Sequence, residues 1–148
     1  MGVIKVELVH ALAEYPKRHT EKSVGYDISV VVGRILAPGP GHGVALDTGI
    51  RFHMEWPDYI ELKARSSSFV YGLLVHPGII DPDFTETVKV LVANFTRSHL
   101  QINPGTRLAQ FILGPHQTLE PIEHLDDARA AWSQDLPRRT GGIGSTGR

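Results

Sequence analysis

A short stretch at residues 78–84 places a carboxylate where it can act as a general base. Two β-branched residues lead into Asp81, and a proline, a second carboxylate and Phe84 follow at once. Because Asp and Pro favour turns for backbone reasons alone, the stretch is first of all typical of an ordinary hairpin turn before a buried strand at 87–92. The same turn can also hold Asp81 and an aromatic ring on a rigid sheet, as a catalytic site requires.

Two other stretches offer donors that suit phosphate oxygens. Arg65 is followed by three serines, and an arginine fork combined with hydroxyl groups binds such oxygens well. Residues 137–148 hold four glycines with serine, threonine and arginine, and the N–H groups of such a segment can cradle phosphate. The alternatives are a solvated loop and a disordered C-terminus. The tail is not a Walker A loop, because the Gly-Lys-Ser/Thr ending is missing.

Two polar residues stand beside or within apolar runs. Asp27 lies where a strand is predicted to begin, in the second half of 24–32, and it either caps a turn or faces a ligand. Gln110 interrupts the apolar run 107–113. If buried, it must be hydrogen-bonded, and a structural partner is as consistent with the sequence as a ligand.

The composition limits the class of protein. A chain of 148 residues predicts one domain, and a net charge of −1 argues against a general nucleic-acid binder. There is no cysteine, the eight histidines show no zinc-site spacing, and no Gly-x-Ser-x-Gly elbow occurs. The apolar runs are too short for a membrane span, and the N-terminus alternates like a strand rather than a signal peptide. We expect a protein that is not secreted, in the cytoplasm or, if viral, in the nucleus of a host cell, with no nucleic-acid or membrane partner.

The elements that must position these residues are short strands. Fifteen glycines and ten prolines separate brief β-branched runs, which predicts an all-β sandwich or barrel. Residues 37–43 are predicted to be a loop, Thr48-Gly49 a bulge, and 126–134 a short helical turn. Strands are expected at residues 3–9, 28–32, 44–54, 59–64, 78–80, 87–92, 100–102 and 107–113.

The order of these elements resembles the homotrimeric deoxyuridine triphosphatases, or dUTPases. The resemblance covers nearly the whole chain and includes the intervening Asp47-Thr48-Gly49-Ile50. Each motif is weak alone, and the set in order is specific. The five motifs are Gly25–Ile28, Arg65–Ser67, Gly78–Phe84, Arg107–Gln110 and Gly141–Gly147.

The resemblance implies a fold, an assembly and a reaction. Residues 1–136 would form an all-β, distorted antiparallel jelly roll of the β-clip type. Residues 137–148 would be a flexible glycine-rich tail that closes over an active site of the trimer, at a subunit interface. The reaction would be Mg²⁺-assisted hydrolysis of dUTP to dUMP and pyrophosphate, which limits uracil in DNA and supplies dUMP for dTMP synthesis.

The resemblance also implies roles for individual residues. Asp81 would be the general base that activates the attacking water, and Asp27 would hold Mg²⁺ indirectly, through water. Phe84 would pack against the deoxyribose and exclude a 2′-hydroxyl, and the backbone around Gly78 would bind the uracil edge. The other substrate-binding residues would be Arg65, Ser66, Ser67, Ile80, Lys89, Gln110, Arg138, Gly142, Ile143, Gly144, Ser145 and Thr146.

The sequence departs from the family pattern at five positions. Phe84 replaces the usual tyrosine, Glu86 stands where glycine is usual, and Ser67 replaces the glycine of the second motif. Ile143 occupies the place of an aromatic that stacks on uracil, so we expect a weaker lid. Arg139 stands at another glycine position, which leaves open whether it or its neighbour reaches the γ-phosphate.

Two alternative functions share parts of this pattern. dCTP deaminases have the same fold and often Arg-Ser-Ser in the second motif, but their chemistry requires a glutamate in the strand after the hairpin, and residues 88–94 contain no acid. The departures also fit a dUTPase-like regulatory or protein-binding module with weak activity. Retention of Asp81, Arg65 and Asp27 argues against a module that has lost its chemistry.

Overall fold

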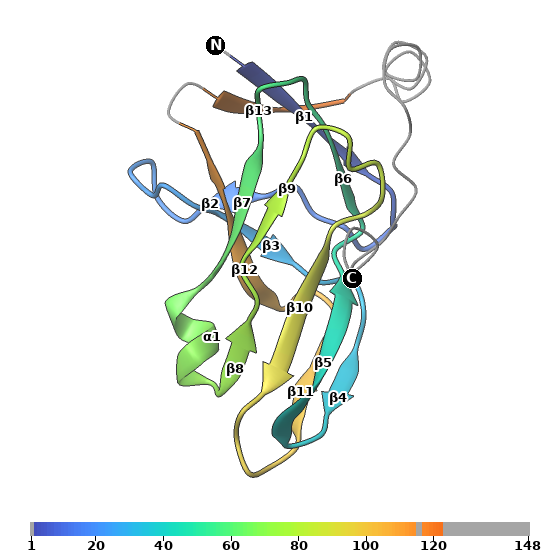
Figure 1. Cartoon of the computed structure of the whole chain (residues 1–148), viewed down its shortest axis with the longest axis vertical. Helices are drawn as coiled ribbons and strands as arrows, with labels where there is room; N and C mark the ends of the chain where they lie inside the picture. Colours follow the sequence, from blue (N-terminus) through green and yellow to red (C-terminus); the bar gives the residue numbers. More distant parts are fainter. Residues whose placement is uncertain (1, 115–116, 123–148) are drawn as a thin grey trace.

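A computed structural model describes residues 2–114 and 117–122, and nearly all of its regular structure is β-strand (Figure 1). The all-β prediction is therefore confirmed for this part of the chain. Within it, no helix is long and apolar enough to cross a membrane. The elements are β1 (Gly2–Leu8), β2 (Lys17–Arg18), β3 (Tyr26–Ser29), β4 (Arg34–Leu36), β5 (Gly39–Asp47), β6 (Ile50–His53), β7 (Ile60–Ala64), α1 (Ser66–Val70), β8 (Leu73–Val75), β9 (Gly78–Ile80), β10 (Lys89–Asn94), β11 (Leu100–Ile102), β12 (Arg107–Leu113) and β13 (Gln117–Pro121).

The largest sheet has five antiparallel strands in the order β2-β3-β12-β7-β9. Phe111 of β12 and Leu62 of β7 stand opposite each other and are buried on its inner face. Phe111 meets Phe52 of β6 edge to face, with ring centroids 4.8 Å apart. This sheet thus has a buried apolar face and an outer face free to carry polar side chains.

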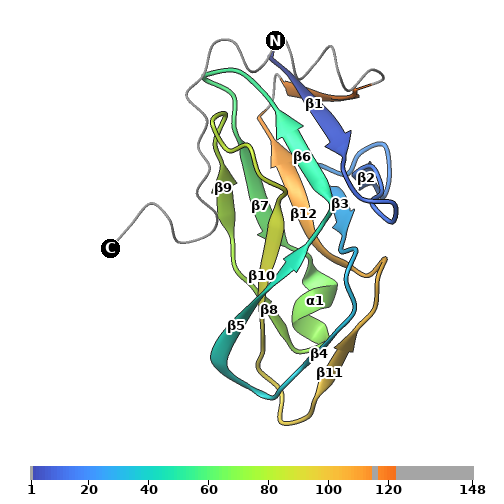
Figure 2. The same ribbon diagram turned by 90° about the vertical axis from the view of Figure 1, so that its right-hand side faces the viewer.

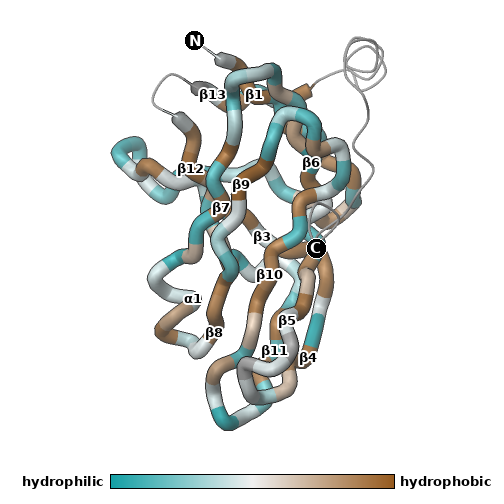
Figure 3. The backbone as a smooth tube through the Cα atoms, in the orientation of Figure 1, coloured by the Kyte–Doolittle hydropathy of each residue, from teal (hydrophilic) through white to brown (hydrophobic). Residues whose placement is uncertain are grey.

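Three smaller sheets complete the layers around the core: β5-β10-β8, β13-β1-β6 and β11-β4. Strand β10 contributes Val90 and Val92 to the core, and its apolar course is brown in Figure 3. Figure 2 shows the five-stranded sheet and the β5-β10-β8 sheet side by side along the long axis of the molecule. All described strand pairs are antiparallel except β1 and β13, which pair in parallel.

Three predictions about the strands were wrong. The strand expected at 28–32 is instead β3, which ends at Ser29. Residues 39–43, taken as part of a loop, belong to β5, although the register jumps from Val44 opposite Val92 to Gly39 opposite Asn94. The glycine- and proline-rich residues therefore belong to a strand whose pairing with β10 is irregular at this point. The predicted hairpin around Asp81 was wrong in its pairing, because β9 pairs with β7 whereas β10 pairs with β5 and β8.

At Thr48-Gly49, where a bulge was predicted, the chain leaves one sheet and enters another. Strand β5 ends at Asp47 and pairs with β10, and β6 begins at Ile50 and pairs with β1. Gly49 has φ = +64°, a left-handed conformation that suits glycine, and a Cβ there would lie 2.7 Å from His10. The predicted helical turn at 126–134 and the tail lie outside the described residues.

Candidate active site

The candidate site lies on the outer face of the five-stranded sheet. Lys17, Asp27, Gln110 and Lys63 stand opposite one another in a row across β2, β3, β12 and β7. The next residue of β3, Ile28, points to the core instead, as the alternation of a strand requires. The sheet therefore brings together polar residues from four separate parts of the sequence.

Asp27 and Arg65 form the central ion pair of this face. Arg65 Nε lies 2.9 Å from Asp27 Oδ1, and Arg65 also donates from NH1 to the Arg107 carbonyl at 3.1 Å. The Asp27 side chain is only 9% exposed, whereas that of Arg65 is 27% exposed. The arginine is thus held in one orientation while part of its guanidinium faces solvent.

The second oxygen of Asp27 has a different environment. Asp27 Oδ2 is buried and has no hydrogen-bond partner in the described part of the chain, and Arg107 NH1 lies 3.7 Å away, too far for a direct hydrogen bond. Asp27 lines a cavity of about 50 Å³, enough for ordered water. The cavity is lined by Glu14, Tyr15, Lys17, Asp27, Ser29 and Arg107.

Gln110 is fixed from two sides. Its Nε2 donates to the Ala64 carbonyl at 3.0 Å, directly before Arg65. A Cβ on Gly25 would collide with the Gln110 side-chain oxygen, so only glycine leaves room for this arrangement. The first and fourth motifs therefore meet through Gly25 and Gln110, and the described hydrogen-bond partner of Gln110 Nε2 is the backbone of Ala64.

The three serines after Arg65 separate into two groups. They begin α1, where Ser66 is exposed and Ser67 half-buried. Ser68 is buried and donates to the Leu108 carbonyl at 2.6 Å, so it ties α1 to β12. Ser66 and Ser67 thus remain the hydroxyls that can contact a ligand beside Arg65.

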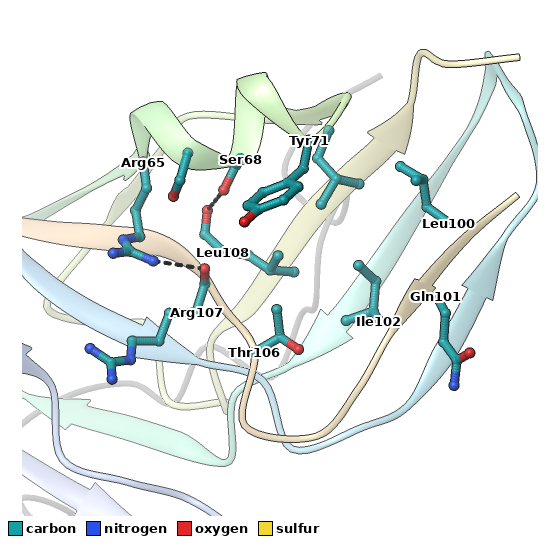
Figure 4. Close-up of a pocket in the computed structure, with 11 residues that line it drawn as sticks. Arg65, Ser68, Tyr71, Leu100, Gln101, Ile102, Thr106, Arg107 and Leu108 are labelled. Carbon is teal, nitrogen blue, oxygen red and sulfur yellow. Dashed lines mark hydrogen bonds between the residues drawn. The ribbon is translucent and has the colours of Figure 1, made fainter. Parts of the chain in front are cut away.

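A second, larger cavity of about 270 Å³ adjoins the ion pair (Figure 4). Figure 4 shows Arg65 and Arg107 together at one end and apolar side chains at the other. The cavity lies between α1, β11 and the start of β12. It is lined by Arg65, Ser67, Ser68, Tyr71, Leu73, Leu100, Gln101, Ile102, Thr106, Arg107 and Leu108.

Asp81 lies far from this cluster within one chain. It is exposed directly after β9, the strand at the end of the five-stranded sheet. From Asp27 it is three strands across and four residues along, which is roughly 20 Å at the usual spacings of a sheet. At that separation Asp81 does not contact Arg65 or Asp27 of the same chain.

The remaining predicted residues fall in several places. Phe84 is half-buried against the core, and its N–H donates to the Asp81 carbonyl at 3.1 Å. The Ile80 side chain belongs to the core, which leaves its backbone for any ligand contact, and a Cβ on Gly78 would meet open space. Lys89 is exposed at the start of β10, opposite Asp47. Arg138, Gly142, Ile143, Gly144, Ser145 and Thr146 lie outside the described residues.

Sequence reasoning missed two cations of the site. Arg107 was quoted within the fourth motif but given no role, although an arginine at the start of a strand that carries Gln110 was a usable signal. Lys17 lies on a two-residue strand that no periodicity reveals, and only its pairing with Asp27 brings it to the site.

Comparison with known proteins identifies the family. The family model described as dUTPase matches residues 11–147. Relatives include the deoxyuridine 5′-triphosphate nucleotidohydrolases of Paramecium bursaria Chlorella virus 1, 34% identical over 99% of both chains, and of Nautilia profundicola, 29% identical over 98% of this chain and 99% of the relative.

Solved structures agree on the fold. A mutant dUTPase from phage phi11 of S. aureus, whose structure details a structural Mg(II) ion, has a TM-score of 0.69 at 20% identity, over 83% of this chain and 98% of that one. The phi11 dUTPase structure that displays a species-specific insert has a TM-score of 0.68, also at 20% identity, over 83% and 97%. The match to the family model over almost the entire length, together with a relative more than 30% identical, shows that this chain belongs to the dUTPase family.

Proposed function

We propose that this protein hydrolyses dUTP to dUMP and pyrophosphate. The observation that carries the proposal is the Asp27–Arg65 pair, held with Gln110 on one sheet face by three of the five family motifs. The Arg65 guanidinium is held by two protein contacts and lies beside the hydroxyls of Ser66 and Ser67. Such a group of donors can bind the oxygens of a triphosphate. Family membership and the names of the relatives support the choice of dUTP.

The reaction needs positioning and charge stabilisation more than covalent chemistry. Asp81 accepts a proton from a water that attacks the α-phosphorus, the new P–O bond forms, and the bond to the β-phosphate oxygen breaks with loss of pyrophosphate. Arg65 and Gln110 orient the phosphates, together with Lys89 where it approaches them. The base and sugar are recognised by the backbone from Gly78 to Ile80 and by the ring of Phe84.

The residues present fit an indirectly held Mg²⁺. No group of three or more potential ligand side chains is found within residues 2–114 and 117–122, so a direct protein cage is not expected there. Asp27 Oδ2 is a buried acceptor without a donor among the described residues, and a metal-bound water would supply one. When bound, Mg²⁺ would neutralise charge on the triphosphate, and Asp27 would hold its water while Oδ1 stays paired with Arg65.

The distance between Asp81 and Asp27 supports active sites shared between subunits of a homotrimer. A neighbouring copy can bring its own Asp81 to the Arg65 cluster, which the same chain cannot do at roughly 20 Å. The exposed apolar residues of α1, β8, the turn between them and the turn after β10 offer a surface for such a contact. They are Phe69, Val70, Tyr71, Leu74 and Phe95, and the rings of Phe69 and Phe95 lie 5.2 Å apart.

The C-terminal tail is assigned the role of a lid. Arg138 binds the γ-phosphate, the backbone from Gly142 to Thr146 closes over the phosphates, and Ile143 covers the base. Deleting residues 137–148 is expected to reduce turnover and to leave the melting temperature of the β domain nearly unchanged. Full turnover by the truncated chain would remove the tail from the mechanism.

A pyrophosphate-release assay with dUTP, dTTP, dCTP and UTP tests the function. We expect Mg²⁺-dependent turnover of dUTP alone, and near-complete loss in Asp81→Asn, with Asp83→Asn as the matched control on the same turn. Equal turnover in Asp81→Asn would remove Asp81 as the base. Release of ammonia from dCTP would indicate a deaminase, which the absence of an acid in β10 argues against.

A further inference from the structure

The turn between β5 and β6 makes hydrogen bonds to the segment that enters β10. Thr48 is fully buried, and both its N–H and its hydroxyl donate to the Val88 carbonyl, at 3.1 and 2.7 Å. Val88 in turn donates from its N–H to the Ile50 carbonyl at 2.8 Å. Three hydrogen bonds therefore fix one residue, Val88, to a turn more than thirty residues earlier in the sequence.

Asp47 extends the same contact by one residue. Its Oδ1 accepts from the Gly49 N–H at 2.8 Å, which shapes the turn, and its Oδ2 accepts from the Thr87 hydroxyl at 3.3 Å. A half-buried carboxylate thus links its own turn to the residue before Val88. Asp47, Thr48, Thr87 and Val88 have no role in the proposed chemistry.

Residues 81–88 form a crossing segment between two sheets. One end follows β9, which is paired with β7, and the other end is the anchored pair Thr87-Val88. Figures 1 and 2 both show this segment reaching β10 beside the junction of β5 and β6. Strands β9 and β10 do not pair with each other, so their pairing does not hold the segment between them. The hydrogen bonds of Val88, called the anchor below, fix the end of this segment that is farther from Asp81.

We propose that Asp47 and Thr48 are positioning residues for Asp81, which they hold through the crossing segment 81–88. The inference rests on the proposed function, in which Asp81 activates the attacking water. Loss of the anchor lets the segment shift, and small displacements of a catalytic group carry large costs in rate. Removing the anchor is therefore expected to lower kcat for dUTP.

The central variant is Thr48→Val, which keeps the shape of the side chain and removes the hydroxyl bond to Val88, together with the 3.3 Å bond that the hydroxyl accepts from the Ile50 N–H. We expect kcat to fall on the order of 10- to 100-fold at a temperature where the protein is fully folded. Thr48→Ser keeps the hydroxyl and should retain kcat within about threefold. Val92→Ala, a buried change in β10 away from the anchor, serves as the destabilised control and should also retain kcat.

Amide hydrogen exchange supplies a second readout that does not depend on activity. The Phe84 N–H, bonded to the Asp81 carbonyl, should exchange faster in Thr48→Val than in wild type or Val92→Ala. If Thr48→Val does not fold, Thr87→Val removes only the bond to Asp47 and should produce smaller changes in the same direction.

The outcomes separate this inference from the proposed function. Near-normal kcat in folded Thr48→Val, or an equal loss in Val92→Ala, would overturn the positioning role. A wild-type protein that does not turn over dUTP would overturn the proposed function instead. In that case unchanged exchange at Phe84 in Thr48→Val would also overturn the anchor, and faster exchange would support it.

Discussion

At the scale of single residues, the site depends on an arginine whose donors are divided between protein and solvent. Arg65 uses Nε for Asp27 and NH1 for the Arg107 carbonyl, and in the proposed function its remaining N–H groups bind phosphate. Lysine carries its three donors on one nitrogen and lacks the planar fork with which Arg65 reaches both partners. We expect Arg65→Lys to lose on the order of 10- to 100-fold in kcat/KM for dUTP, nearly as much as Arg65→Ala.

Steady-state kinetics on both variants measures this effect. Arg34→Lys, an exposed exchange of the same kind on β4, is the control and should match wild type. Near-normal kcat/KM in Arg65→Lys would mean that charge alone is required and that the bridging geometry is irrelevant.

Gly25 allows a second prediction at this scale. A methyl group there would collide with the flexible end of Gln110, so we expect Gly25→Ala to displace Gln110 and leave the free energy of unfolding within about 1 kcal/mol of wild type. Activity should fall as far as in Gln110→Ala, and the double variant should fall no further, because both changes remove one interaction. Additive losses in kcat/KM would show that Gly25 acts separately from Gln110.

At the scale of elements, the sequence predicts strands better than their partners. The bounds of β12 match the predicted 107–113, and β7 and β11 lie within a residue of their predicted ranges, because alternation and flanking turns are local signals. The pairing of β9 and β10 with separate sheets depends on contacts with β7 and β5, which no local pattern encodes. The short helix α1 was missed because three serines after an arginine are typical of a loop.

The serines at the start of α1 can be separated by measurement. Ser68 donates a buried hydrogen bond to Leu108, so Ser68→Ala should lower the free energy of unfolding by about 1–3 kcal/mol. Exposed Ser66 should leave stability unchanged when replaced by alanine but raise KM for dUTP. Thermal melts and kinetics on the two variants check both effects. A stability loss in Ser66→Ala equal to that in Ser68→Ala would contradict this division.

At the scale of the whole molecule, the motif residues are not all close together within one chain. Asp27, Arg65 and Gln110 meet on one sheet face because β3, β7 and β12 are neighbours. Asp81 belongs to the same motif set yet lies three strands away. A linear order of motifs cannot show which of its residues meet within one chain, whereas the order of strands in the sheet can.

Mixing two inactive variants tests whether the site is shared. Asp81→Asn and Arg65→Ala subunits, refolded together in equal amounts, should recover about one quarter of wild-type activity, since a site needs intact Arg65 from one chain and intact Asp81 from its neighbour. Refolding Asp81→Asn with a chain that carries both substitutions is the control and should recover nothing. If the two residues acted within one chain, no mixed assembly would contain a complete site. Pyrophosphate release after co-refolding therefore decides between sites within and between subunits, and activity confined to the trimer fraction on sizing would locate the shared site in that assembly.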